Sequence, residues 1–218
     1  MNFLEKRKIL LIISGGIAAY KSLDLIRSLI KIQCEVKTIL TKGGAEFVTP
    51  LSIASLSKNK VYSDMYSVEN ESEMDHISLS RWADLILIAP ATSNIIAKMS
   101  QGISDDLATT VVQASNKSIF VCPAMNVRMW EHASNKQNLE KIKSYNYRII
   151  GPFNGEMACG EYGDGRMADI KYILNELDNF FKSKSNNKKF KAVVTAGPTR
   201  EFIDLSLIHI SEPTRLRS

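Results

Sequence analysis

The N-terminal part of the chain joins a short apolar run, a glycine turn and a helical pattern. Residues 8–14 (Lys-Ile-Leu-Leu-Ile-Ile-Ser) predict a buried parallel strand. Gly15 and Gly16 follow, and apolar residues then recur at helical spacing as far as Ile32. A strand, a glycine turn and a helix begin a nucleotide-binding βα unit, in which N–H groups of the turn and of the helix N-terminus hold a phosphate. We therefore expect a phosphate site at Gly15 and Gly16, to which Ser14 adds a hydroxyl.

The glycine turn narrows the class of nucleotide. Its sequence, Ser-Gly-Gly-Ile-Ala-Ala, is not Gly-x-Gly-x-x-Gly, and no Gly-Lys-Ser or Gly-Lys-Thr follows it. A mononucleotide with one phosphate therefore fits better than a dinucleotide or a triphosphate. A plain strand-to-helix corner without a ligand stays open as the alternative.

The alternation of short apolar runs with helical segments continues along the chain and predicts an α/β fold with a doubly wound parallel sheet. Pro90 and Pro123 are expected to end two of the strands, because proline lacks the N–H that a sheet requires. Further strands are predicted over 35–40, 85–89, 118–121 and 147–150, and a small one near Val61. Helices are predicted over 45–57 with a break at Pro50, and over 75–84, 95–99, 107–114, 134–144 and 169–181.

Small polar side chains follow three of the predicted strands. They are Thr41 and Lys42 after residues 35–40, the run Thr92-Ser93-Asn94 after Pro90, and Asn126 after Pro123. Open α/β sheets bind ligands beyond the carboxyl ends of their strands, so these side chains belong to one edge. The amide of Asn126 can donate and accept, which suits a carboxylate or amide substrate. The alternative is a strand-to-helix turn that carries two core methionines.

Two further side chains are candidates for proton transfer. His76 falls in the first turn of the helix that Asp75 caps, where the positive helix end favours the neutral ring that a general base needs. Cys159 lies within residues 151–167, a glycine-rich stretch that predicts a flap closing over a substrate. The alternatives are a surface or capping histidine and a packed cysteine.

Composition excludes several classes of protein. The 218 residues are 44% hydrophobic and 23% charged, which is typical of a globular chain. The net charge of +5 comes from lysine and arginine clusters without interleaved aromatic residues, so we expect no nucleic-acid partner. Three cysteines without metal-type spacing predict no metal site and a reducing, cytoplasmic environment. The apolar run of residues 9–13 is too short for a signal or membrane-spanning segment.

Three stretches together resemble a known family. They are Pro-Ala-Met-Asn-Val-Arg-Met-Trp at 123–130, His76 ahead of Trp-Ala-Asp at 82–84, and Ala-Cys-Gly at 158–160. Residues 8–181 resemble the phosphopantothenoylcysteine decarboxylase domain of the bacterial bifunctional coenzyme A biosynthesis protein. That domain is one of the homo-oligomeric flavin-containing cysteine decarboxylases. The resemblance implies a flavodoxin-like or Rossmann-like three-layer flavoprotein with FMN.

The resemblance also assigns roles to individual residues. His76 matches the base, Asn126 the contact to the substrate carboxylate, and Cys159 the proton donor. Met125 and the flap residues Glu156, Met157 and Ala158 match further substrate contacts. The flavin contacts that it implies, besides Ser14 from the turn above, are Gly15, Gly16, Ile17, Thr41, Lys42, Gly43, Thr92, Ser93, Asn94, Ile95 and Ala124.

The implied reaction converts 4'-phosphopantothenoylcysteine into 4'-phosphopantetheine. The substrate is oxidised to a thioaldehyde, carbon dioxide leaves, and the resulting enethiol is reduced again with help from the flavin. The resemblance implies a trimer or a multiple of trimers, and the composition above predicts no membrane or nucleic-acid partner. A flavin prenyltransferase, a peptidyl-cysteine decarboxylase and a non-catalytic flavin-binding regulator remain as alternatives.

The C-terminal part divides into three segments after the decarboxylase domain of residues 1–181. A lysine-rich linker is predicted over 182–190, and residues 191–204 resemble the opening of a phosphopantothenate–cysteine ligase domain. Residues 205–218 depart from that family. The run 205–215 matches the translation of a transposase adapter used for sequencing libraries, so we expect it to be foreign. We expect no ligase activity from this chain.

Overall fold

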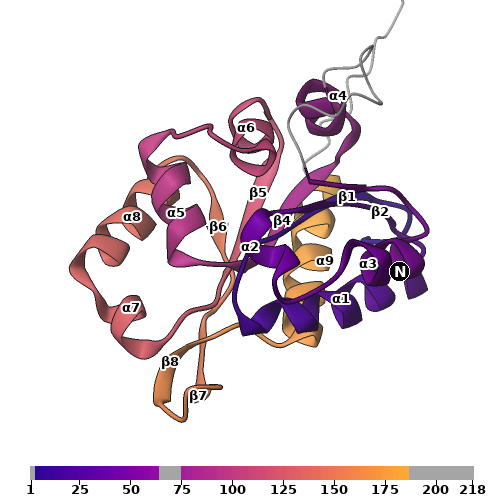
Figure 1. Cartoon of the computed structure of the whole chain (residues 1–218). Helices are drawn as coiled ribbons and strands as arrows, with labels where there is room; N and C mark the ends of the chain where they lie inside the picture. The colour runs from indigo at the N-terminus through magenta and orange to yellow at the C-terminus, as the bar shows by residue number, and fades with distance from the viewer. Residues whose placement is uncertain (1–2, 64–74, 187–218) are drawn as a thin grey trace, which may run out of the picture. The chain divides into compact units, whose positions relative to one another are not determined.

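The central element is a sheet of six parallel strands, seen in a computed structural model that describes residues 3–63 and 75–186 (Figure 1). The spatial order is β3-β2-β1-β4-β5-β6, the Rossmann order, which confirms the predicted doubly wound sheet. The chain leaves β1 toward β2 and later returns to the other side of β1 with β4, so the strand order reverses between β1 and β4. The strands are β1 (Lys8–Ile13), β2 (Glu35–Leu40), β3 (Val61–Tyr62), β4 (Leu85–Ala91), β5 (Ser118–Pro123) and β6 (Arg148–Ile149).

Helices cover both faces of the sheet. In β1, Ile9, Leu11 and Ile13 point into one core, while Leu10 and Ile12 point into the other. Both faces are therefore buried, which explains why the strand sequences are continuously apolar. One core includes α1 (Tyr20–Lys31, after a 3-10 turn Ile17–Ala19), α3 (Pro50–Ser57) and α9 (Ile170–Asn186). The other includes α4 (Asp75–Trp82), α5 (Ser93–Gln101), α6 (Leu107–Gln113) and α8 (Ala133–Ser144).

Two short helices and a hairpin complete the described fold. Helix α2 (Lys42–Ala45) follows β2, and helix α7 (Val127–Glu131) follows β5. The antiparallel strands β7 (Phe153–Glu156) and β8 (Tyr162–Arg166) form what we call the flap hairpin (residues 153–166). Among the described residues, no helix combines the length and the apolar character needed to cross a membrane.

The flap hairpin is fixed at its base. The Met125 N–H donates to the Gly165 carbonyl (3.0 Å), and any side chain at position 165 would collide with the Met125 carbonyl. Glycine is therefore required for this close approach. The turn at the hairpin tip is held by a hydrogen bond from the Met157 N–H to the Glu161 carbonyl (2.9 Å). The predicted glycine-rich flap is thus an ordered hairpin.

Three predicted boundaries differ from the structure. Pro90 does not end its strand, because β4 continues to Ala91, which pairs with Pro123 after a register shift that removes the need for a proline N–H. The helix predicted over 45–57 begins only at Pro50, which confirms the predicted break there; Pro50 is the first residue of α3, a position where the missing N–H has no helical partner. Helix α9 extends to Asn186, through part of the predicted linker. The predicted segments 191–204 and 205–218 lie outside the described residues.

A core substitution tests this packing. Phe120 in β5 is 2% exposed and meets Phe180 of α9 edge to face, with ring centroids 5.2 Å apart. We expect Phe120→Ala to lower the free energy of unfolding by about 3–5 kcal/mol, as large-to-small core changes do. Urea denaturation measures the difference.

The matched control for this test is Leu51→Ala in α3. Leu51 is 77% exposed, so its truncation should change the free energy of unfolding by less than about 0.5 kcal/mol. Equal losses for the two variants would contradict the assignment of Phe120 to the core.

Candidate functional site

Ser14 joins the ends of β1 and β4 where the strand order reverses. Its side chain is 3% exposed, and its hydroxyl donates to the Pro90 carbonyl (2.7 Å) and accepts from the Thr92 N–H (3.1 Å). We call this pair of hydrogen bonds the Ser14 bridge. The Ser14 hydroxyl was expected to bind a phosphate, but both of these hydrogen bonds are made to the protein backbone. The Ser14 bridge holds Gly15 and Gly16 beside the start of α5.

Three of the predicted polar residues are helix caps. Thr41, Thr92 and Asn126 each stand between the carboxyl end of a strand and the start of α2, α5 or α7, where free backbone N–H groups need an acceptor. The three helices therefore begin at the same edge of the sheet. The hydrogen bonds are Gly44 N to Thr41 Oγ1 (3.1 Å), Ile95 N to Thr92 Oγ1 (3.4 Å) and Met129 N to Asn126 Oδ1 (2.8 Å).

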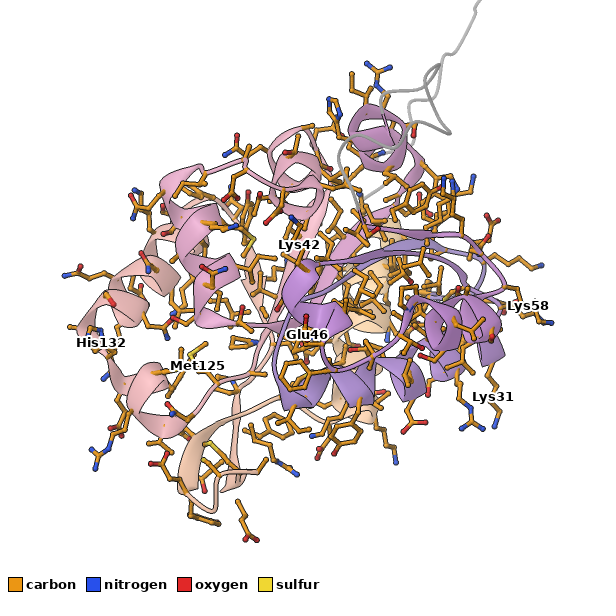
Figure 2. All side chains as sticks on the ribbon, in the orientation of Figure 1. Lys31, Lys42, Glu46, Lys58, Met125 and His132 are labelled. Atoms are coloured by element: carbon orange, nitrogen blue, oxygen red, sulfur yellow. The ribbon has the colours of Figure 1, made fainter. Side chains whose placement is uncertain are left out.

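A cavity of about 820 Å³, here called the rim cavity, lies at this edge. It is bordered by the glycine turn after β1 and by the segment with Lys42 and Glu46 after β2 (Figure 2). A Cβ on Gly15 would lie 3.1 Å from the Gly43 carbonyl oxygen, so the two backbones approach closely beside the cavity. The predicted flavin contacts that line it are Ser14, Gly15, Gly16, Thr41, Lys42, Gly43, Thr92, Asn94 and Ile95.

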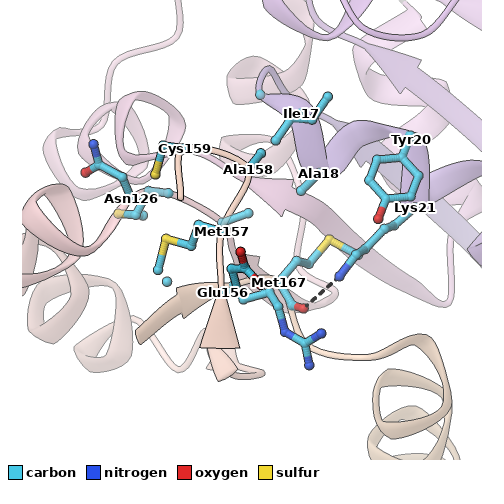
Figure 3. A pocket seen from close by; sticks show the side chains of 15 residues that line it. Ile17, Ala18, Tyr20, Lys21, Asn126, Glu156, Met157, Ala158, Cys159 and Met167 are labelled. Carbon is cyan, nitrogen blue, oxygen red and sulfur yellow. Dashed lines mark hydrogen bonds between the residues drawn. The ribbon is translucent and has the colours of Figure 1, made fainter. Parts of the chain in front are cut away.

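A second cavity of about 570 Å³, here called the flap cavity, lies against the flap hairpin (Figure 3). Gly16 lines both cavities, so they adjoin at the glycine turn. In the view of Figure 3, Asn126 and Cys159 lie toward one side of the flap cavity, and Tyr20 and Lys21 toward the other. The predicted residues that line it are Ile17, Ala124, Met125, Asn126, Glu156, Met157, Ala158 and Cys159.

Two predicted residues line neither cavity. Ser93 is the first residue of α5, next to Thr92, and His76 lies in the first turn of α4. Neither cavity therefore supports the predicted role of His76 as a base, and this role stays a prediction.

The three cysteines differ in their surroundings. Burial raises the pKa of the Cys34 thiol to about 11, and this thiol donates to the Leu4 carbonyl at 3.1 Å. Burial also raises the pKa of the Cys122 thiol. Cys159 is exposed at the hairpin tip, where its thiol lies 3.8 Å from a carboxylate oxygen of Glu161. Cys159 is thus the cysteine that a ligand in the flap cavity can reach.

Lys98, Asp105 and Asp106 also line the rim cavity, and sequence reasoning did not assign them there. The Lys98 ammonium lies 2.6 Å from the Asp105 carboxylate and 3.0 Å from that of Asp106. The hydrogen bond to Asp105 is the largest cause of the raised pKa of Lys98. Burial acts to raise the pKa of Asp106, but hydrogen bonds from Thr109 and Lys98 outweigh it and lower the pKa.

Other lining residues were also missed by sequence reasoning. Tyr20, Lys21 and Arg166 line the flap cavity, and Phe47 and Met129 line the rim cavity. Lys21 follows the glycine turn closely, so its position in the sequence could have predicted that it lies near the ligand. Arg166 offered none, because only the pairing of β7 with β8 brings it to the cavity.

The Rossmann strand order, the glycine turn at the reversal point and the two adjoining cavities define a nucleotide-binding α/β protein. The protein-family model described as Flavoprotein matches residues 2–182. The chain therefore belongs to the flavoprotein family.

Comparison with individual proteins is consistent with membership of this family. The chain is 42% identical over 201 residues to the coenzyme A biosynthesis bifunctional protein CoaBC of Haemophilus influenzae, a match that covers 92% of this chain and 50% of that protein. The chain thus spans about half the length of the curated relatives it matches. A solved PPC decarboxylase variant complexed with pantothenoylaminoethenethiol has a TM-score of 0.72 and 29% identity, covering 82% of this chain and all of that chain. The FMN binding protein AtHal3 has a TM-score of 0.70 and 32% identity, covering 82% and 98% of the two chains.

The lowered pKa of Asp106 predicts a pH-dependent stability. Its contribution is fully present above the unfolded-state pKa of about 3.9 and is lost as the pH falls through the lower folded-state value. Asp106→Asn keeps a capping side chain but removes the charge. We expect the variant to be less stable than the wild type near neutral pH, and the difference to shrink between roughly pH 5 and roughly pH 2. Urea denaturation at several pH values measures this.

The control for Asp106 is Asp24→Asn in α1. Asp24 forms an exposed ion pair with Arg27 (3.5 Å), so the free energy of unfolding should change by less than about 0.5 kcal/mol at each pH. A stability difference for Asp106→Asn that did not change with pH would contradict the assigned ion pair.

Proposed function

We propose that the chain binds FMN in the rim cavity and decarboxylates 4'-phosphopantothenoylcysteine in the flap cavity. The observation that carries this proposal is the contact of the two cavities at Gly16, with Asn126 and Cys159 lining the second one. A cofactor held at the glycine turn would therefore adjoin a substrate that reaches both side chains. The similarity to CoaBC proteins and to a PPC decarboxylase supports the choice of reaction.

The residues of the rim cavity fit FMN. Gly15 and Gly43 lie close together and have no side chains that could fill the rim cavity. The first turn of α5 directs backbone N–H groups toward the same edge of the sheet. Its volume of about 820 Å³ lies within the usual range for cofactor sites. The likeness to AtHal3, an FMN binding protein, supports the same cofactor.

Asn126 would orient the substrate carboxylate. Its Oδ1 accepts the N–H of Met129 at the start of α7, which fixes the orientation of the amide. The Nδ2 group has no hydrogen-bond partner among the described residues, so it remains to donate to a carboxylate. The cap and the substrate contact thus use opposite ends of one side chain.

Bound FMN would supply a reversible two-electron oxidation, which gives the electrons of the breaking C–C bond an acceptor. Asn126 holds the carboxylate that leaves as carbon dioxide. The Cys159 thiol, on the exposed turn of the flap hairpin, would protonate the carbon that lost carbon dioxide, and the returned hydride would go to the neighbouring carbon that bears the sulfur, which gives the saturated thiol. Met125 and Met157 line the flap cavity and help to exclude water.

A homo-oligomer, with a trimer as the smallest unit, would complete the site. His76 lines neither cavity of its own chain, so another copy would have to supply it. Ile17 is 57% exposed, and Phe47 and Met129 are also exposed where they line the cavities. Apolar side chains open to solvent beside a site are typical of an interface.

The three free cysteines suit the reducing conditions of the cytoplasm.

Product analysis tests the reaction. We expect the FMN-loaded full-length chain to release carbon dioxide from 4'-phosphopantothenoylcysteine and to form 4'-phosphopantetheine. Cys159→Ser should still release carbon dioxide but accumulate the enethiol, because the proton donor is missing. Cys34→Ala, at a buried cysteine that lines neither cavity, is the control and should form the saturated product. Normal saturated product from Cys159→Ser would contradict the proton-donor role.

Asn126→Asp separates the cap from the substrate contact. Aspartate caps a helix as well as asparagine does, so α7 should form normally. The new charge should repel the substrate carboxylate and raise KM by about 10- to 100-fold, the loss of a hydrogen bond to a charged group. Gln137→Glu adds the same charge on the exposed face of α8 and should leave KM unchanged. Unchanged KM for Asn126→Asp would exclude the carboxylate contact.

A further inference from the structure

Two basic residues line the flap cavity and have no part in the chemistry described above. Lys21 comes from the first turn of α1 and Arg166 from the end of β8. In Figure 3, Lys21 lies on the side of the cavity away from Asn126 and Cys159. The cavity therefore has a carboxylate-binding end and a separate basic end.

Protein groups accept only some of the hydrogen bonds that the two basic side chains can donate. The Lys21 ammonium donates to the Met167 carbonyl at the long distance of 3.5 Å. One terminal nitrogen of Arg166 lies 3.3 Å from the Asp169 carboxylate, whose side chain is 55% exposed. The Nε atom of Arg166 is buried and has no partner among the described residues. The other terminal nitrogen of Arg166 forms no hydrogen bond or ion pair with the described residues, so this nitrogen and the weakly bonded Lys21 ammonium remain for a ligand.

The charges at the basic end do not balance locally. Burial lowers the pKa of Lys21, and the nearby charge of Arg166 lowers it further, while Asp169 opposes both effects. Glu156 is the other charged residue that lines the flap cavity, and it forms no ion pair with either cation in the described part of the chain. Two cations therefore share one largely exposed carboxylate, an arrangement that an incoming anion would stabilise.

We propose that Lys21 and Arg166 form an anion subsite for the phosphate monoester of the substrate, while Asn126 holds its carboxylate at the other end. This inference rests on the proposed function, and it identifies the residues that select the substrate. A phosphate monoester carries about −1.5 to −2 charge and several acceptor oxygens, which suits an ammonium beside a guanidinium. A peptidyl-cysteine substrate has no such group, so the subsite favours a small phosphorylated substrate over a peptide.

Two substrates that differ only in the phosphate test the subsite. We expect the FMN-loaded full-length wild type to show a kcat/KM for 4'-phosphopantothenoylcysteine about 10- to 100-fold above that for pantothenoylcysteine. Lys21→Met and Arg166→Met should each reduce this ratio by about tenfold or more, whereas Lys21→Arg should retain most of it. Lys31→Met is the control, because Lys31 is an exposed lysine at the far end of α1 (Figure 2). It should leave the ratio unchanged.

The outcomes separate the subsite from the proposed function. If the wild type decarboxylates both substrates with equal kcat/KM, or if the variants weaken both equally, the subsite is wrong and the reaction stands. Turnover of neither substrate would overturn the reaction itself. Calorimetric titration with 4'-phosphopantetheine and with pantetheine tests the subsite without turnover. Tighter binding of the phosphorylated compound, lost in Lys21→Met, supports the subsite, and equal binding of the two compounds overturns it.

Discussion

The hydroxyl of Ser14 is the interaction on which the site depends. Through its hydrogen bonds to Pro90 and Thr92, it ties the end of β1 to the end of β4 at the point where the strand order reverses. At such a point the connections that follow two neighbouring strands leave toward opposite faces of the sheet, and a crevice opens between them. The Ser14 bridge joins the two sides of that crevice, so it holds the glycine turn beside the start of α5. The rim cavity follows from this constraint.

The second cavity depends on a different principle, because one of its walls is a hairpin and not part of the central sheet. The flap hairpin is anchored at its base by the contact of Gly165 with Met125, while its tip carries the exposed Cys159. Asn126 stands in the rigid turn after β5, where capping of α7 fixes its amide. The proposed chemistry thus places the group that orients the substrate on the scaffold, and the group that moves a proton on a hairpin tip with few contacts.

Sequence reasoning predicted most elements, because their signals are local. The apolar run of β1 and the Asp106 cap of α6 are visible in a few neighbouring residues. The end of β4 was not predictable, because the pairing of Ala91 with Pro123 depends on a neighbouring strand. The basic residue Arg166 was missed for the same reason, since only the folded hairpin brings it beside Lys21. His76 is a different case: its role was inferred from its place at a helix start and from resemblance, and it lines neither the rim cavity nor the flap cavity of the described chain.

The central claim is that the rim cavity is a flavin site, and the visible absorbance spectrum of the purified full-length chain tests it most directly. We expect a yellow protein with flavin absorption bands and an equimolar content of FMN after denaturation. We also expect protein stripped of flavin to take up added FMN to the same level. A colourless protein that fails to take up FMN would contradict the claim.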